Sequence, residues 1–176
     1  IRLLFVSILH FRKELIAPPV APRVANVAVR AMDVPADMAA WLRLRVRATS
    51  ELHPRPREWN EADFRTEMLG KRWWRTEHCW VAVAGNLSNG PSEIVGSVTL
   101  ALREGEASTV PVVHWLLVDP AWRRRGIGQL LMSQLEQAAW HAGWREVQLE
   151  THAGWAAAIA FYQSMGYAPV RDRSPR

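Results

Sequence analysis

The fold is decided by the stretch VVHWLLVDPAWRRRGIGQLLMSQLEQAAWHAG, residues 112–143. Its first part, 112–118, is an apolar run typical of a strand, and Asp119-Pro120 ends it. The apolar residues that follow recur at helical spacing from Ile127 to Ala139. Gly143 stands where a glycine closes a helix. The stretch therefore predicts a strand, a glycine-containing turn and a helix.

The turn itself, RRRGIG at 123–128, has the composition of a phosphate site. Glycine lets the backbone pass close to a ligand, and the amides at a helix start are free donors in a positive dipole field. Two other nucleotide motifs are excluded: the third glycine of G-x-G-x-x-G would fall at Leu131, and no G-x-x-x-x-G-K-[ST] is present. Taken alone, the R-x-x-G-x-G turn also fits a solvated arginine cluster at a helix cap.

Strand-like and helix-like segments alternate on both sides of this stretch. The other expected strands cover residues 27–32, 80–84, 94–102 and 146–151. The other expected helices cover residues 36–48, 61–74 and 156–165. Residues 36–48 also fit the alternation of a strand, but the stripe formed by Met38, Trp41, Leu42 and Val46 favours a helix. A loop is expected at 53–60, and GNLSNGPS at 85–92 predicts a hairpin turn. The order βααβββαβα, with a tail that supplies one last strand, predicts an α/β (α+β) domain with one mixed sheet.

Size and composition limit the class of protein. The chain has 176 residues, 49% of them hydrophobic and 22% charged, which fits one globular domain and not a disordered chain. No apolar run approaches the roughly 20 residues of a membrane helix, so no membrane partner is expected. Cys79 is the single cysteine, which makes a reducing cytoplasm the default expectation. His78 and Cys79 are adjacent with no second pair at zinc spacing, so no metal is expected.

The formal net charge of +5 lies in the two ends of the chain. Residues 26–168 hold 15 basic and 15 acidic side chains, and the excess comes from 1–25 and 169–176. A neutral body removes net charge as an argument for a nucleic-acid partner.

The first segment of the chain does not join the pattern that follows it. Its apolar run is near the lower limit for a secretory signal and lacks a clear cleavage site. Prolines 18, 19 and 22 then make an extended linker. We expect a disordered N-terminal extension at 1–25, with a targeting or docking segment as the alternative, a folded domain at 26–170 and a basic tail at 171–176.

Downstream stands LETHAGWAAAIAFYQSMGY at 149–167, with a tyrosine on a short helix and a Gly-aromatic pair after it. Together with the strand HWLLVDP and the turn RRRGIG, it resembles the GNAT superfamily of acyl-CoA-dependent N-acetyltransferases. The segment is also similar to its counterpart in enzymes that acetylate the N-terminal alanine of a ribosomal protein. The resemblance covers about 112–168. It implies the GNAT fold, a central mixed and mostly antiparallel sheet flanked by helices, and acetyl-CoA as cosubstrate.

The resemblance also implies where the cosubstrate binds. The backbone of the strand would bond the pantetheine arm, the amides of the turn would cradle the pyrophosphate, and the arginine side chains would screen the phosphates. The residues implied are Leu116, Leu117, Val118, Arg123, Arg124, Arg125, Gly126, Ile127, Gly128 and Gln129. One position departs from the pattern of many relatives, because Trp155 stands where an asparagine contacts the cofactor seven residues before the tyrosine.

Three catalytic candidates follow from the same resemblance. Tyr162 would protonate the leaving thiolate; a packed helix tyrosine is its alternative. An alkylammonium must lose a proton before it can attack, so a base is needed. Glu150 matches the base position of the ribosomal-protein acetyltransferases, and His114 matches one in the arylalkylamine branch. Each acts directly or through a water chain, unless the glutamate is a structural acceptor and the histidine a core residue.

These features predict an N-acetyltransferase in which an amine attacks acetyl-CoA directly in a ternary complex. The alternative is a non-catalytic acyl-CoA-binding or sensing domain, which Trp155 favours. The acceptor is a small-molecule amine or a protein N-terminal amine. Acidic residues and Trp59 within 49–67 suit a cationic acceptor, although a solvated loop fits them as well. The oligomeric state is open, although dimers are common among GNAT proteins.

Overall fold

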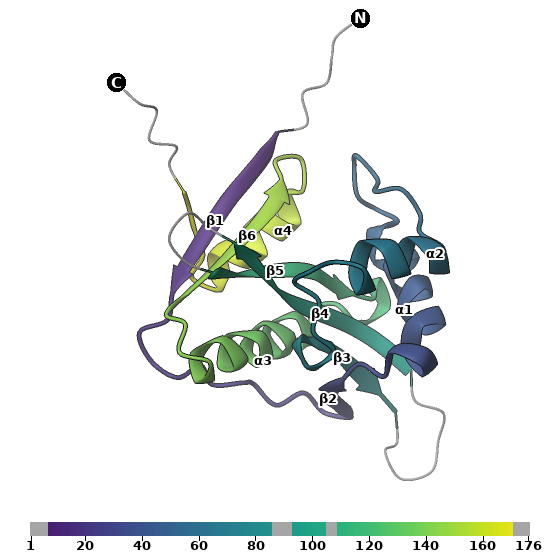
Figure 1. Cartoon of the computed structure of the whole chain (residues 1–176), viewed down its shortest axis with the longest axis horizontal. Helices are drawn as coiled ribbons and strands as arrows, with labels where there is room; N and C mark the ends of the chain where they lie inside the picture. Colours follow the sequence, from purple (N-terminus) through teal and green to yellow (C-terminus); the bar gives the residue numbers. More distant parts are fainter. Residues whose placement is uncertain (1–6, 86–92, 105–108, 171–176) are drawn as a thin grey trace, which may run out of the picture.

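A computed structural model describes residues 7–85, 93–104 and 109–170, and it contains one seven-stranded sheet with helices on both faces (Figure 1). The strands are β1 (Ile8–Glu14), β2 (Val27–Ala31), β3 (Cys79–Ala84), β4 (Glu93–Glu104), β5 (Thr109–Val118), β6 (Glu146–His152) and β7 (Ala168–Pro169). The helices are α1 (Val34–Thr49), α2 (Glu61–Phe64), α3 (Ile127–His141) and α4 (Ala156–Ser164), with single 3-10 turns at Thr76–His78 and Pro120–Trp122.

The strands lie in the order β2-β3-β4-β5-β6-β1-β7. Every neighbouring pair is antiparallel except β5 and β6, which run parallel. A parallel pair needs a crossover connection, and α3 provides it. The predicted fold class, a mixed and mostly antiparallel sheet flanked by helices, is confirmed.

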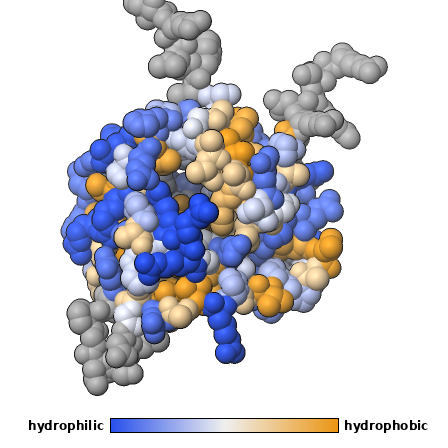
Figure 2. All heavy atoms as spheres, turned by 180° about the vertical axis from the view of Figure 1, so that it is seen from behind, coloured by the Kyte–Doolittle hydropathy of each residue, from blue (hydrophilic) through white to orange (hydrophobic). Residues whose placement is uncertain are grey.

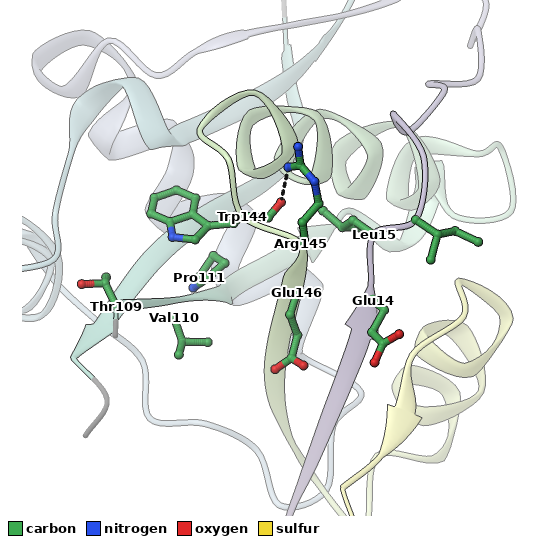
Figure 3. A pocket seen from close by; sticks show the side chains of 9 residues that line it. Glu14, Leu15, Thr109, Val110, Pro111, Trp144, Arg145 and Glu146 are labelled. Carbon is green, nitrogen blue, oxygen red and sulfur yellow. Dashed lines mark hydrogen bonds between the residues drawn. The ribbon is translucent and has the colours of Figure 1, made fainter. Parts of the chain in front are cut away.

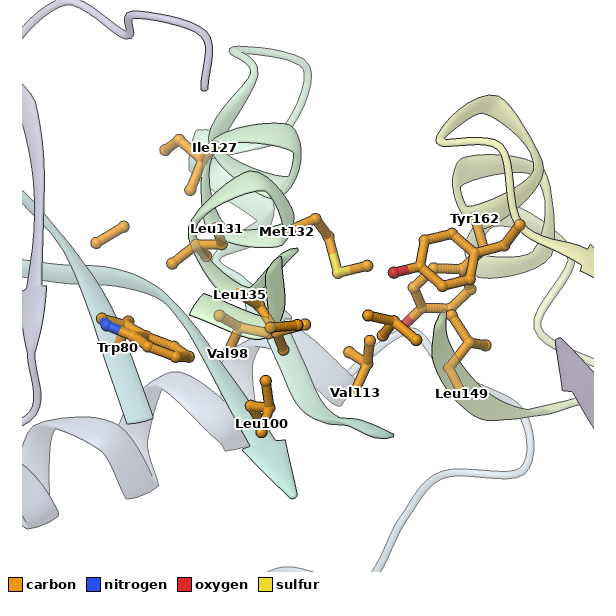
Figure 4. Packing of buried hydrophobic residues seen from close by; sticks show 14 of the residues in the cluster. Trp80, Val98, Leu100, Val113, Ile127, Leu131, Met132, Leu135, Leu149 and Tyr162 are labelled. Atoms are coloured by element: carbon orange, nitrogen blue, oxygen red, sulfur yellow. The ribbon is translucent and has the colours of Figure 1, made fainter. Parts of the chain in front are cut away.

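Two hydrophobic clusters fill the spaces between the sheet and its helices. On one face α3 and α4 pack against the sheet through residues such as Leu131, Leu135 and Tyr162, with Val113 and Leu149 beneath them (Figure 4). On the opposite face α1, α2 and the turn after α2 pack through Trp41, Leu44, Phe64 and Met68. The helical stripe predicted from Ile127 to Ala139 faces the sheet: Ile127, Leu131, Leu135 and Ala139 are buried, and Leu130 and Ala138 are half-buried.

Strand β1 corrects the expectation that residues 1–25 form a disordered extension. Residues 8–14 pair with β6 along their whole length and lie inside the sheet, between β6 and β7. Phe11 is 2% exposed and packs in the cluster beneath α3. Lys13 points to the same face, where its Nζ lies 2.7 Å from the Glu136 carboxylate. The alternation is hidden in the sequence because this inward position carries a charge.

The second expected helix is shorter than its predicted span of 61–74. Helix α2 continues through a π-helical turn at Arg65–Leu69 and ends at Gly70, whose amide donates to the Arg65 carbonyl at 2.7 Å. Trp73 and Trp74 then turn back to pack against the α1–α2 cluster. The antiparallel pairing of β3 with β4 is as predicted, whereas the hairpin residues 86–92 lie outside the described part of the chain.

Candidate active site

The central feature of the site is a fork between the parallel strands β5 and β6. They pair only at Val112 with Gln148 and at Val113 with Leu149. Just beyond this point β5 has a bulge: Ser97 pairs with Leu117 but Thr99 pairs with His114, so β5 carries one extra residue. Such a bulge bends a strand away from its neighbour. In the described chain, no strand pairs with the β6 side of β5 beyond Val113, which leaves the backbone of 116–118 open to a ligand.

The bulge places one residue in an unusual backbone conformation and changes the direction of two side chains. Trp115 adopts a φ of +50°, which is unusual for a residue with a side chain. The extra residue shifts the alternation, so that His114 and Trp115, adjacent in sequence, both lie among the aromatic residues on the α1–α2 face. No glycine marks the bulge, so no local signal in the sequence predicts it.

At the open end of the fork, the chain turns into α3. Gly126 precedes the helix with a φ of +84°, and Arg124 has a φ of +63°. Within the described residues, the amides from Arg124 to Gln129 donate to no backbone or side-chain acceptor, and the first helical bond is that of Leu130 to Gly126. Free amides at the start of a helix, here one of 15 residues, are able to bind an anion.

The three arginines of the turn differ in what they contact. Arg123 donates to Glu51 at 2.7 Å and to the Ala48 carbonyl at 2.9 Å, both near the end of α1. Its guanidinium therefore caps α1 and fixes the turn. Arg125 lies over the ring of Trp122, with its Cζ 4.7 Å from the centroid.

The two glycines of the turn also have different roles. Gly126 supplies the left-handed conformation that starts the helix. Gly128 instead allows α4 to approach α3: a Cβ at this position would lie 3.0 Å from Phe161 Cζ. The absence of a side chain at Gly128 thus lets the two helices that flank the fork pack closely.

Tyr162 projects from α4 beside the end of the strand pairing. Figure 4 shows its hydroxyl pointing toward Met132 of α3, with Leu149 and Val113 close by. The hydroxyl bonds to no described residue, whereas the hydroxyl of Tyr167 donates to Glu136 at 3.0 Å. Burial raises the pKa of Tyr162 to about 12, so the phenol keeps its proton at neutral pH.

Glu150 and His114 lie one residue beyond the last paired positions of β6 and β5. Glu150 is exposed, and its carboxylate lies 2.7 Å from Arg103 of β4 and 3.4 Å from His10 of β1. The ring of His114 lies against Trp73, with centroids 4.9 Å apart. The two candidate bases are thus positioned at one level of the fork.

His114 is expected to make stability depend on pH. Burial, together with the cations of Lys71 and Arg103, lowers its pKa from 6.5 to about 4. Between pH 6.5 and pH 4, His114 is therefore protonated in the unfolded chain but neutral in the folded protein. The free energy of unfolding is highest above pH 6.5 and decreases as the pH falls toward 4. Between pH 7 and pH 5 we expect a loss of about 2 kcal/mol. Urea unfolding should show this slope flattened in His114→Gln, and an unchanged slope would contradict the assignment.

Trp155 joins two loops above the fork. Its Nε1 donates to the Pro54 carbonyl at 3.3 Å, and its ring lies 5.7 Å from that of His152. The neighbouring Gly154 approaches the His53 carbonyl closely enough that a Cβ would lie 3.0 Å away. The α1–α2 loop is therefore held against the turn that leads from β6 to α4.

The acidic side chains between Thr49 and Glu67 are largely engaged in ion pairs. Four of the five bind a nearby cation: Glu51 pairs with Arg123, Glu58 with Arg55, Asp63 with Arg57 and Glu67 with Lys71. Strongly hydrophilic side chains gather on the half of the molecule that carries α1 and α2 (Figure 2). The acidic lip expected for a cationic acceptor is thus neutralised within the protein.

Arg45 also lies in the site region, although nothing in the local sequence distinguishes it from the other arginines of α1. It is 2% exposed, and its guanidinium lies 4.3 Å from the ring centroid of Trp59 and 4.5 Å from that of Trp115. It donates to the Arg57 carbonyl at 2.8 Å. This cation holds the aromatic wall beside the bulge together.

One surface cavity, of about 520 Å³, lies away from the fork. Figure 3 shows it at the opposite ends of β5 and β6, between Thr109, Trp144, Glu146 and Glu14. It contains no candidate site residue. Within the described ranges no three His, Cys, Asp or Glu side chains are grouped for a metal ion, and no helix is long and apolar enough to cross a membrane.

The sequence matches the Acetyltransferase (GNAT) family over residues 40–167. Among curated proteins it is similar to mycothiol acetyltransferases: that of Salinispora tropica is 29% identical over 90% of this chain and 50% of its own length. That of Nocardiopsis dassonvillei is 29% identical over 93% of this chain and 52% of its own length. The chain thus spans about half the length of these relatives.

Solved structures share the fold. A GCN5-related N-acetyltransferase from Sphaerobacter thermophilus superposes with a TM-score of 0.73 at 21% identity, covering 93% of this chain and 48% of its own. An aminoglycoside N-acetyltransferase in complex with CoA gives 0.62 at 20% identity, over 89% and 98%. The NatC complex bound to Gag peptide and CoA gives 0.65 at 19% identity, over 83% and 87%.

Proposed function

The chain belongs to the Acetyltransferase (GNAT) family, and we propose that it transfers the acetyl group of acetyl-CoA to a primary amine. The observation that carries this proposal is the fork between β5 and β6. On one side of it lies a phenol that stays protonated, on the other an exposed carboxylate, and at its open end a row of free amides. The proposed activity is that of these 176 residues, which correspond to about half the length of the curated relatives.

The residues around the fork fit coenzyme A. The unpaired backbone of Leu116, Leu117 and Val118 would hold the pantetheine arm as an added strand does. The free amides from Arg124 to Gln129 would hold the pyrophosphate, and Gly126 lets the backbone turn toward it. Arg124 and Arg125 are exposed and would face the phosphates, whereas Arg123 holds the turn in place.

Acetyl-CoA supplies the activated acyl group as a thioester. Tyr162 holds a proton on its hydroxyl at neutral pH and would donate it to the departing sulfur. Glu150 is the base that the geometry favours, because its carboxylate is exposed beside the fork. Burial lowers the pKa of His114 to about 4, so that the imidazole is neutral at pH 7 but only weakly basic.

Direct attack by the amine is favoured over an acylated enzyme. A covalent route needs a reactive nucleophile, and the single cysteine is unsuited to that role. Cys79 is buried, burial raises its pKa to about 11, and its sulfur accepts a hydrogen bond from Thr99 Oγ1 at 3.2 Å. It is also separated from the fork by β4, since it lies on β3.

The acceptor we propose is the primary amine of a small molecule. The names of the matched mycothiol and aminoglycoside acetyltransferases support this class. A protein N-terminal amine is the second candidate, because the NatC complex was solved with a peptide.

Replacing Gly126 by Trp is expected to weaken acetyl-CoA binding at least tenfold, because the new side chain strains a left-handed residue and covers the free amides. Isothermal titration calorimetry measures this directly. Gly143→Trp is the matched control: Gly143 has a φ of +91° at the other end of α3, and no atom lies within 4 Å of a Cβ built there. Equal affinities of both variants, or no binding by the unaltered chain, would contradict the proposed function.

A further inference from the structure

Another cavity, of about 340 Å³, lies beside the first residue of β5, and two of its lining residues contact the candidate bases. It is lined by Arg72, Trp73, Arg75, Leu102, Arg103 and Thr109. Three of the six side chains are arginines, and none of the six is acidic. A cavity walled by cations and one indole suits an anion on a small organic molecule.

The charges of these arginines are incompletely neutralised. Arg72 contacts no carboxylate in the described chain, and Arg75 donates to the carbonyls of Arg72 and Trp74 at 3.2 and 2.7 Å. Among the described residues, Arg103 is the one of the three with an acidic partner, Glu150 at 2.7 Å. The nearby carboxylate of Glu67 is bound to Lys71 at 2.8 Å. The cavity therefore keeps guanidinium donors available for a ligand.

Two lining residues connect the cavity to the candidate bases. The ring of Trp73 contacts His114 with centroids 4.9 Å apart, and the guanidinium of Arg103 contacts the Glu150 carboxylate. Trp73 and Arg103 thus lie between the cavity and the two candidate bases, so that a molecule long enough to extend past them would reach the fork. The lowered pKa of His114, caused by burial and then by Lys71 and Arg103, agrees with a positive potential at this place.

We propose that this cavity binds an anionic group of the acceptor, so that the preferred substrates are primary amines that also bear a carboxylate or phosphate. The inference rests on the proposed acetyl transfer and narrows its substrate class. It disfavours polyamines and other polycationic amines, for which the paired acidic residues of 49–67 leave little free negative charge.

Arg103 would connect anion binding to the base. A guanidinium has five donors in a planar fork and can contact two anions at once. An acceptor carboxylate bound by Arg72 and Arg103 would share the Arg103 guanidinium with the Glu150 carboxylate. The Glu150 carboxylate then stays in place while its interaction with Arg103 weakens, which leaves it available to the ammonium at the other end of the acceptor.

The test compares ω-amino carboxylates of increasing chain length with their ω-amino amides, and phosphoethanolamine with ethanolamine. Thiol release from acetyl-CoA gives kcat and KM for each. For one chain length we expect kcat/KM to be about tenfold or more higher for the anionic member, mainly through KM. The preference should shrink as salt is raised, because the arginines are exposed.

Variants of Arg72 test the cavity without touching the cofactor site. Arg72→Gln should reduce the anion preference several-fold, and Arg72→Glu should shift it toward diamines, with acetyl-CoA affinity unchanged in both. Arg43→Gln is the matched control, because Arg43 is exposed on α1 and lines no part of the cavity. Turnover with equal or better use of the neutral and cationic amines would overturn this inference alone. No turnover with any amine would overturn the proposed function and this inference with it.

Discussion

Replacing Tyr162 by Phe is expected to lower kcat about 100-fold or more while leaving acetyl-CoA affinity unchanged. The phenol is buried beside the end of the β5–β6 pairing, its pKa is raised to about 12, and its hydroxyl is not used by any described residue. The substitution removes one oxygen and keeps the packed ring, so that it abolishes proton donation without disturbing the packing. Steady-state thiol release and calorimetry with acetyl-CoA measure the two quantities separately.

The other tyrosine of the chain provides the matched control. Tyr167→Phe removes the same atom, but this hydroxyl donates to the buried carboxylate of Glu136 at 3.0 Å. We expect Tyr167→Phe to lower the free energy of unfolding by about 1–3 kcal/mol and to keep kcat, the reverse of the Tyr162 result. An unchanged kcat in Tyr162→Phe would contradict the acid role. Acetyl-CoA binding without turnover in the unaltered chain would favour the acyl-CoA-binding domain instead.

The second large effect is expected at Phe11 in β1. Phe11→Ala should lower the free energy of unfolding by about 3–5 kcal/mol, because the ring is 2% exposed and packs beneath α3. For a chain of this size the loss corresponds to a decrease in Tm of about 10 °C. Thermal unfolding followed by circular dichroism gives this value.

Ile16→Ala is the control for Phe11, since Ile16 lies two residues beyond β1 and is 90% exposed. It should change the free energy of unfolding by less than about 0.5 kcal/mol. Equal effects of the two substitutions would mean that residues 8–14 do not form part of the sheet in solution. A large effect of Phe11 alone places the first segment of the chain within the folded domain.

Much of the cofactor half could be predicted because its signals are local. The turn at 123–128 and the helix after it depend on glycine conformation and on apolar spacing over a few residues. The helix that carries Tyr162 is defined in the same way by 156–165 and the glycine that follows. The structure contains both elements at these places, and the family and fold class inferred from them are confirmed. The roles of Tyr162, Glu150 and His114 stay predictions.

Other features depended on residues far apart in the chain. Lys13 breaks the apolar alternation of β1, and its inward position makes sense only beside Glu136, which lies 123 residues away. Arg123 belongs to the candidate phosphate turn. Its guanidinium also caps α1, by contacting Glu51 and the Ala48 carbonyl, which lie more than 70 residues earlier in the chain.

The sequence by itself determined the fold class, the family and the candidate phosphate turn, because these follow from backbone conformation and periodicity within short segments. The tertiary structure alone decided that β1 lies inside the sheet, that a bulge at Trp115 brings His114 and Trp115 to one face, and that the acidic residues near α2 are paired. Burial and ion pairing depend on which distant side chain is opposite, and no local pattern carries that information. The charge around this cavity is therefore a property of the folded chain, with Arg72, Arg75 and Arg103 in its lining.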